Sequence, residues 1–437
     1  MGNEHINVSL RGRTIRVAVY ATTVATALAG VGVLAANAKD RNAPPDVRRP
    51  AAMKDYQTRY YQLHTDLPAD TVTEAKRRLT LMAEEYWART KSFGGVIRDR
   101  MDFFIFKNYA DYIEAGTPPD SAGVFMHWTS GGKRNGRMMA ILSSPEDWHV
   151  VQHEGFHQFV HMTMSGDIPI WSNEGLAEYF GEGIWTGDTF VLGVVPERRL
   201  RRVVKLIEQD RMMTPLDMMK LTHEDWNFGL SGRNYDQAWS MVHFLAHGDG
   251  GKYQNAYAAF LGAVAKGQPW EKAWIDRFGR DTDKFRNVYS AWWKAQGANP
   301  PTEPQTRALV HTMTSFLARA AVLKLKFETS AEFFAAAKDG KLKLDPVKQV
   351  ALWLPEALLS GALAKVPKAG DWSLDTKAAP KLLLTDPQGG KFVGSYILGE
   401  GKVTTQVAYT PPPKSATAPA KPVSGSSSSS DPDPLEE

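Results

Sequence analysis

The chain contains no cysteine in its 437 residues. Disulfides, cysteine zinc ribbons, cysteine-ligated iron–sulfur clusters and thiol catalysis are therefore excluded. Protein ligands to any metal are then expected to be His, Asp or Glu. The chain also lacks a strong charge excess, because its formal net charge is only +4. Since no basic and aromatic groove pattern accompanies this charge, we expect no nucleic-acid partner.

The first 38 residues have the order of a secretory signal peptide. Arginines precede an apolar stretch from Val17 to Ala36, and Ala36-Asn37-Ala38 offers a cleavage site. The stretch is about as long as a membrane span, but it is weakly hydrophobic because Ala, Thr and Gly dominate it. An uncleaved N-terminal anchor and a buried core helix are the alternatives. The first two predict export to the periplasm, the cell envelope or the medium, with membrane contact only through an anchor.

Shifts in composition divide the chain further. From Pro411 onward Pro, Ala, Lys and Ser dominate, which is typical of a disordered tail. We predict a leader (1–38), a proline-rich linker (39–53), a first domain (54–299), a small accessory domain (300–409) and a disordered tail (410–437). The sequence indicates no internal repeat and no particular oligomeric state.

Hydrophobic periodicity predicts an α+β protein. A helix is expected over 71–90, and strands are expected over 102–106, 122–127 and 137–142, the last two as a hairpin. Helices should dominate the rest of the first domain. The predicted ranges are 146–163, 173–182, 197–209, 215–222, 234–247, 253–266, 270–278 and 281–296. The accessory domain should combine helices at 304–325 and 346–365 with strands at 380–385, 391–398 and 402–409.

The segment from Val150 to Phe159 contains a His-Glu-x-x-His pattern. On a helix His153 and His157 lie four residues apart and share one face, where two imidazoles can hold a zinc ion. Glu154 lies beside them as a candidate general base. His149 and His161 continue the row, and we interpret them as helix-end or solvent histidines or as hydrogen-bond partners of the ligands.

The third ligand separates the classes of zinc peptidase. A metzincin would place Gly and then His on the next two turns, where this chain has Val160 and Thr163. Gluzincins take a glutamate from the following helix, and Glu174 fits with sixteen residues between it and His157. Glu178 lies one turn further on and can orient a ligand histidine. The competing interpretation is that both glutamates belong to a solvated helix face. For the basic residues of the predicted helix 197–209, a solvated face is the interpretation that we favour.

Three ordered motifs carry a resemblance to a known family. They are His153-Glu154-x-x-His157-Gln158, Pro169-x-Trp171 continuing into Glu174-Gly175-Leu176-Ala177-Glu178-Tyr179-Phe180, and Tyr235-x-Gln237-Ala238-Trp239 continuing to Leu245. Residues 54–296 resemble the peptidase-MA-like proteins, a group of bacterial zinc peptidases of the gluzincin clan. The second motif is also similar to a stretch of the gluzincin aminopeptidases, and the clan includes thermolysin.

The resemblance implies a mainly helical gluzincin-like domain with a small preceding sheet. It implies that Glu174 is the third zinc ligand, that Glu154 is the general base and that Tyr235 stabilises the oxyanion. The alternative for Tyr235 is a packing aromatic, with His223, His243 and His247 as competing donors. Family layout suggests that strand 137–142 is the edge that pairs with a peptide. The aminopeptidase G-x-M-E-N motif is absent, so a general aminopeptidase is not supported.

These observations predict an exported zinc metallopeptidase that acts on a peptide or protein. Two other hypotheses remain open. One is an envelope-anchored binding or scaffold protein with a vestigial zinc site. The other is a zinc amidase that acts on cell-wall material.

Overall fold

The computed structural model describes residues 47–91, 96–130, 133–164, 168–227, 232–346, 348–399 and 401–413, and three short strands before them. These strands are β1 (Val8–Leu10), β2 (Arg13–Ile15) and β3 (Ala18–Thr22). The rest of the predicted leader, and most of the predicted linker and tail, lie outside the described residues. The fold is mixed α+β, as predicted. No helix within the described part of the chain is long and apolar enough to cross a membrane.

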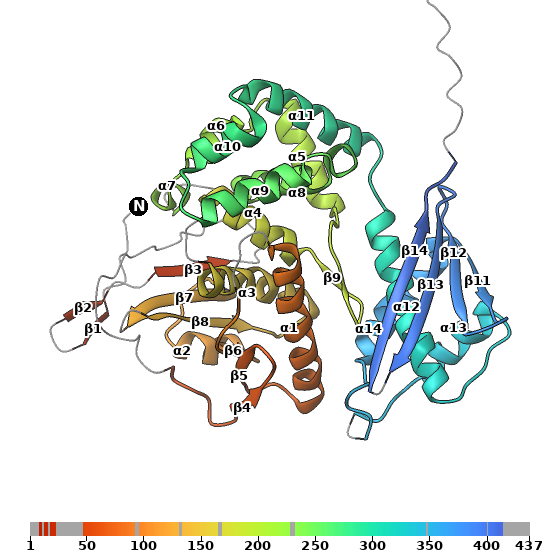
Figure 1. Ribbon diagram of the computed structural model, residues 1–437. Coiled ribbons are helices and arrows are strands. Elements are labelled where there is room, and N and C mark those ends of the chain that lie inside the picture. The colour runs from red at the N-terminus through yellow and green to blue at the C-terminus, as the bar shows by residue number, and fades with distance from the viewer. Residues whose placement is uncertain are drawn as a thin grey trace, which may run out of the picture.

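A six-stranded mixed sheet forms the base of the first part of the chain (Figure 1). Its strands are β4 (Lys54–Gln57), β5 (Tyr61–Thr65), β6 (Met101–Phe106), β7 (Gly123–Ser130) and β8 (Lys133–Ile141), with β3 at one edge. The order is β3-β7-β8-β6-β5-β4. β6 is parallel to β5 and β8, whereas β7 and β8 form the predicted antiparallel hairpin.

Helices cover both faces of this sheet. Phe103 and Ile105 of β6 pack into the main core with α1 (Ala69–Arg89) and α3 (Trp148–Thr163). Phe104 and Phe106 point to the other face, where α2 (Tyr109–Glu114) supplies Tyr112. A strand that is buried on both faces has a nearly continuous apolar sequence, as β6 does. The predicted strand 102–106 is thereby confirmed as a central strand.

The structure corrects the prediction that strand 137–142 is an edge strand. β8 is hydrogen-bonded to β7 on one side and to β6 on the other, so neither of its sides is free. The prediction was wrong because the pairing of β6 with β8 joins strands that are far apart in sequence. The outer strand of the hairpin is β7, and its other side pairs with β3.

A helical layer lies above α3 (Figure 1). Its elements are α4 (Ile170–Gly181), α5 (Glu197–Glu208), α6 (Pro215–Lys220), α7 (His223–Asn227), α8 (Gly232–Gly251), α9 (Gln254–Ala265), α10 (Trp270–Phe278) and α11 (Thr282–Ala298). Between α4 and α5 the chain forms a short hairpin of β9 (Ile184–Trp185) and β10 (Phe190–Val191), which lies outside this layer beside α1 and α12. The regular helix of α8 ends at His247, because the following three residues have non-helical backbone angles. All eight helices predicted between residues 145 and 297 are confirmed, within a few residues at their ends.

Helix α4 is in close contact with both α3 and α8, and Gly175 permits the second contact. A Cβ atom at Gly175 would lie 2.5 Å from the carbonyl oxygen of Ala238 and 2.7 Å from Cγ2 of Val242. No larger residue fits such a distance without moving a helix backbone. The glycine therefore sets how closely the α8 residues approach Glu174.

The C-terminal part packs helices against one face of an antiparallel sheet (Figure 1). Its elements are α12 (Glu303–Val322), α13 (Ser330–Lys338), α14 (Glu356–Leu363), α15 (Val366–Ala369), β11 (Asp371–Asp375), β12 (Lys381–Thr385), β13 (Lys391–Gly399) and β14 (Lys402–Thr410). One continuous cluster of buried apolar residues extends from Tyr61 through Met313 to Leu382. The C-terminal part therefore shares the main core with the rest of the chain.

The prediction for this part was partly wrong. The helix expected over 346–365 is shorter, because α14 begins only after Pro355. Proline disfavours helical backbone in the residue before it, and this explains the late start. Helix α13 and strand β11 were not predicted, and neither were β4 and β5 at the start of the first domain.

A buried ion pair fastens α12 to the hairpin of β9 and β10. Nη1 and Nη2 of Arg319 lie 2.8 and 2.9 Å from the two carboxylate oxygens of Asp188. The Arg319 side chain is fully buried, and it also donates to the carbonyl oxygens of Ser315 and Leu352. Gln305 adds a bond to the carbonyl of Val195 at 2.9 Å.

We expect Asp188→Ala to destabilise the protein by about 3–5 kcal/mol, because the Arg319 guanidinium would stay buried without its counter-charge. Urea unfolding followed by circular dichroism measures the change. The control is Lys343→Ala, which removes an exposed pair with Glu356 at 2.7 Å and should cost less than about 1 kcal/mol. Equal losses in the two variants would contradict the role given to the buried pair.

Candidate metal centre

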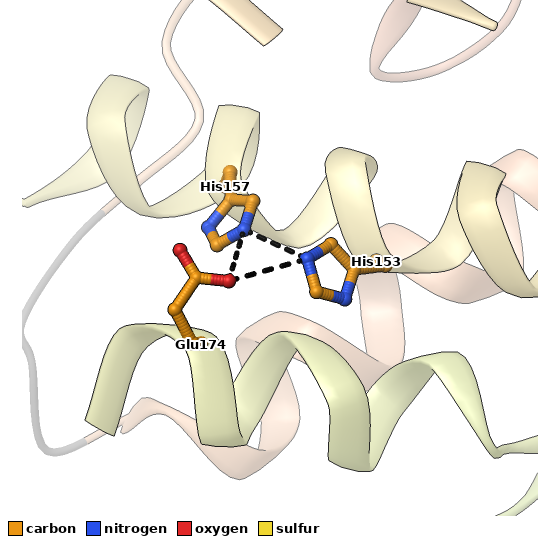
Figure 2. A group of neighbouring side chains, drawn as sticks. All are labelled: His153, His157 and Glu174. Atoms are coloured by element: carbon orange, nitrogen blue, oxygen red, sulfur yellow. Dashed lines mark hydrogen bonds and ion pairs between the residues drawn. The ribbon is translucent and has the colours of Figure 1, made fainter. Parts of the chain in front are cut away.

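Helices α3 and α4 bring three of the predicted site residues together. Figure 2 shows His153 and His157 on α3, with Glu174 facing them from α4. The Nε2 atoms of the two histidines are 3.0 Å apart, and each lies 3.5 Å from Oε2 of Glu174. All three side chains are almost fully buried.

The triangle of ligand atoms has the size that zinc requires. Ligands at about 2.0–2.1 Å from a tetrahedral zinc ion lie about 3.3–3.4 Å from one another. The separations of 3.0 and 3.5 Å bracket this value. Two imidazoles and a carboxylate are also a common ligand set of catalytic zinc. Within the described residues, Oε1 of Glu174 is buried without a hydrogen-bond partner. These residues therefore fit a zinc ion.

The electrostatics of the three side chains also favour a bound cation. Burial alone would raise the pKa of Glu174, but the adjacent His157 and His153 outweigh it and lower the pKa to about 2. Burial alone would lower the pKa of His153, whereas Glu174 and Glu178 raise it above its usual range. Both pKa shifts favour the charged form of the side chain, the carboxylate of Glu174 and the imidazolium of His153. The carboxylates make this buried position strongly attractive to positive charge.

Glu154 lies on α3 beside the ligand pair and is fully buried. The start of β7 packs against it, because a Cβ at Gly123 would lie 3.0 Å from Cγ of Glu154 and 2.4 Å from Cγ1 of Val150. The charge of Glu154 contributes to the raised pKa of His153 and also acts on Tyr235. The predicted base is therefore close to both the ligands and the predicted oxyanion donor.

Glu178 lies behind the ligands, where the sequence predicted an orienting residue. Its Oε1 is 3.4 Å from Nδ1 of His153, on the side of the ring away from Glu174. Its Oε2 is 2.6 Å from Nη2 of Arg199. A carboxylate behind a ligand histidine fixes the orientation of the ring and makes it a stronger ligand.

The sequence analysis missed the residues that hold Glu178 in place. Arg199 also contacts Glu182 at 3.2 Å and Asp236 at 3.5 Å, and its guanidinium lies over the ring of Trp239. Asp236 in turn forms a bidentate pair with Arg202, at 2.5 and 2.7 Å. The expectation of a fully solvated basic face on 197–209 was therefore wrong for Arg199, which is buried. The available signal was the position of Arg199, which lies next to Leu200 and four residues before Val203, and so on the apolar side of the helix.

His149 joins this network and belongs to a second group with metal-ligand chemistry. It lies 3.4 Å from Glu178 and 3.6 Å from Glu182, and these three residues can converge on one point. Arg199 already occupies the space beside both carboxylates. A guanidinium there would repel a metal ion, so this group serves as an ion-pair network.

Tyr235 approaches the ligands from the start of α8. Its ring centre is 6.4 Å from that of His153 and 5.2 Å from that of Trp226, which it meets edge to face. Burial, with Glu174 close by, raises the pKa of Tyr235 well above its ordinary value. The phenol therefore keeps its proton at neutral pH and is able to donate a hydrogen bond.

The competing histidines have other partners. His243 lies 3.2 Å from the carbonyl oxygen of Gly193, and His247 lies 2.9 Å from the hydroxyl of Tyr179. Burial lowers the pKa of His243 to about 3 and that of His247 to about 4, so both are neutral at physiological pH. His161, which was predicted only as the last histidine of the row on α3, lies beside His127 with 4.3 Å between ring centres and the two rings tilted by 35°. None of the three belongs to the ligand triangle.

Gln152 was also missed, and it joins the two helices of the site. Its amide nitrogen lies 3.0, 3.0 and 3.1 Å from the carbonyl oxygens of Phe180, Gly181 and Gly183, at the end of α4. Its oxygen accepts a bond from Arg78 of α1 at 2.8 Å. The sequence shows only that a glutamine stands directly before the motif, and nothing in that position predicts this contact.

A comparison with known protein families gives a match that contains the candidate site. A family model described as a protein of unknown function (DUF1570) matches residues 147–271. The matched range includes all six predicted site residues, but neither the six-stranded sheet nor the C-terminal part. No curated protein matches the chain.

We expect Glu178→Gln to weaken zinc binding by about 10–100-fold, because the amide is a poor partner for Nδ1 of His153. Arg199→Lys should cause a smaller loss, since it keeps the charge but cannot contact three carboxylates at once. Competition with a chromogenic zinc chelator measures both, with thermal melts to verify folding. The control is Arg201→Gln, which changes an exposed side chain on the same helix. Unchanged affinity in Glu178→Gln would refute the orienting role.

Proposed function

We propose that this protein is a zinc-dependent metallopeptidase of the gluzincin type. The observation that carries the proposal is the triangle of His153, His157 and Glu174, with separations that suit tetrahedral zinc, next to the buried Glu154. A site built for structural zinc would be closed by a fourth protein ligand. The ligand group among the described residues has three members, which leaves a position for water or substrate.

Each residue then has a defined task in peptide hydrolysis. Zinc, when bound, would act as a Lewis acid and lower the pKa of water. Glu154 accepts the proton of the attacking water and returns it to the leaving nitrogen. The Tyr235 hydroxyl donates to the carbonyl oxygen as negative charge develops on it. Glu178, held by Arg199, keeps the His153 ring in its binding orientation.

The gluzincin assignment rests on the order of the elements as well as on the motifs. A mixed sheet precedes the first ligand helix, the third ligand follows on α4, and Tyr235 begins a later helix. We further infer that a peptide substrate pairs with the outer side of β7, whose first residue packs against Glu154. Segment β3 occupies that side and lies within the predicted leader. Removal of the leader would therefore free the strand for a substrate.

We propose that the protein is exported and acts in the periplasm, the cell envelope or the medium. The support is the order of charged, apolar and small residues in positions 1–38. Residues 300–409 would then serve as an accessory unit that is fixed to the peptidase part by the buried Arg319 and Asp188.

Glu154→Gln tests the mechanism directly. We expect the variant to retain stoichiometric zinc and to lose peptide hydrolysis by about 10²–10⁴-fold, because the amide cannot accept a proton. The assay uses a fluorescence-quenched peptide library and metal analysis of the same preparation. Glu208→Gln, an exposed change at the end of α5, is the control. Turnover at the wild-type rate in Glu154→Gln would falsify the mechanism.

The same assay separates the alternative functions. Zinc-loaded wild-type protein that cleaves no peptide and no cell-wall amide would support a scaffold with a vestigial site. Cleavage of cell-wall amides without peptide cleavage would support the amidase. Either outcome would overturn the peptidase proposal.

Tyr235→Phe distinguishes a hydrogen-bond donor from a packing aromatic. We expect kcat to fall by about 10²–10³-fold, because one oxyanion donor is lost. KM and zinc affinity should change little, since the ring and the three ligands stay in place. Steady-state kinetics on a peptide selected from the library measure the two constants. A kcat equal to that of the wild type would assign Tyr235 to packing alone.

A further inference from the structure

We propose that a second site, distinct from the metal centre, binds a single-chain amphiphile with an anionic head group, such as a long-chain fatty acid. The site is a cleft of about 1120 Å³ between the first part of the chain and the C-terminal part. One wall is lined by residues of α1, the start of α3 and β9, and the other by residues of α12, α14 and α15. Figure 1 shows α1 on one side and α12 and α14 on the other. None of the three candidate zinc ligands lines it.

The walls of the cleft are largely apolar. Trp148, Trp185 and Leu142 line one side, and Leu309 and Leu358 line the other. Binding sites for small molecules are concave, mostly apolar and frequent between domains. An alkyl chain gains roughly 0.8 kcal/mol for each methylene group that it buries in such walls. The volume is sufficient for an elongated chain.

Several polar side chains in the walls already have partners in the fold, although the side-chain oxygen of Gln305 is buried without one among the described residues. Ser143 donates to Asp147 at 2.9 Å, and Thr312 donates to the carbonyl oxygen of Ala308 at 2.9 Å. The amide nitrogen of Gln305 is bonded to the carbonyl of Val195. A peptide backbone needs hydrogen-bond partners along its whole length, and these walls offer few. The cleft therefore favours an alkyl chain over an extended peptide.

The rim of the cleft supplies a counter-charge for an anionic head group. Lys107, Lys365 and Lys368 are exposed residues that line the cleft. Among the ion pairs of the described residues, none includes any of these lysines. The two acidic residues that line the cleft already form ion pairs, because Glu74 pairs with Arg78 and Glu197 pairs with Arg201. The unpaired charge at the rim is thus positive.

Gly361 of α14 offers a way to fill the cleft without disturbing the core. It lines the cleft, and no atom lies within 4 Å of the position that its Cβ would take. Gly361→Trp therefore places an indole where an alkyl chain would lie. Gly361→Ala is the matched control, because a methyl group leaves the cleft open. The Lys365→Glu/Lys368→Glu variant reverses the charge of the rim.

The experiment uses the full chain and the fluorescent C18 fatty acid cis-parinaric acid as the probe. We expect saturable binding to the wild type and to Gly361→Ala, with affinity at least roughly tenfold weaker in Gly361→Trp. The charge-reversed variant should also bind roughly tenfold more weakly. Dodecanoate should displace the probe at a lower concentration than dodecyltrimethylammonium, which has the same chain and the opposite charge. Thermal melts verify that each variant is folded.

A palmitate that carries a terminal diazirine locates the bound chain. After irradiation, mass spectrometry should find adducts on peptides from the walls of the cleft, which contain residues 67–78, 142–148, 184–185, 300–312 or 355–369. Absence of saturable binding, equal affinity of Gly361→Trp and wild type, equal displacement by the two detergents, or adducts elsewhere would each overturn the proposal. The Glu154→Gln variant should bind the probe as the wild type does, so the outcome is independent of the peptidase proposal.

Discussion

The contact between α3 and α4 is the constraint on which the site depends. The two candidate ligand histidines lie on α3, and two ligands alone do not fix the position of a metal ion. The third candidate ligand, Glu174, must reach the same point from α4. The amide of Gln152 ties α3 to the end of α4 through three carbonyl oxygens. Gly175 lets α8 approach from the other side of α4. The position of Glu174 relative to His153 and His157 is therefore set by a buried side-chain amide that holds the end of α4 and by the close packing of α4 against α8.

A buried network of charges extends this constraint outward from the ligands. Glu178 joins His153 to Arg199, and Arg199 joins Glu182 and Asp236. Burying so many charges costs desolvation free energy, so such a network is poor evidence for stability. What it gives is a fixed orientation of the His153 ring, because one oxygen of Glu178 faces His153 and the other is held by Arg199. The same guanidinium that orients Glu178 also prevents the nearby His149 group from becoming a competing metal site.

The C-terminal part is fixed to the rest of the chain by polar contacts as well as by apolar packing. Arg319 and Asp188 form the buried anchor, and Arg77 of α1 donates to the carbonyl oxygen of Trp353 at 2.9 Å. Arg78, the neighbour of Arg77 on α1, lines the apolar cleft and is bonded to Gln152 of α3. The cleft and the candidate metal centre are thus separate, and α1 and α3 connect them.

The sequence by itself determined the features that depend on neighbours along the chain. Four-residue spacing placed His153 and His157 on one helix face. Apolar periodicity predicted the helices from α3 to α11, with the exception of the short α7, and the β7–β8 hairpin. Only the tertiary structure decided that β8 is an inner strand, that Arg199 is buried behind Glu178, and that Gln152 joins two helices. The partners of these residues are 21 or more positions away. Local propensity carries no information about such pairs, because burial and packing between distant segments select them.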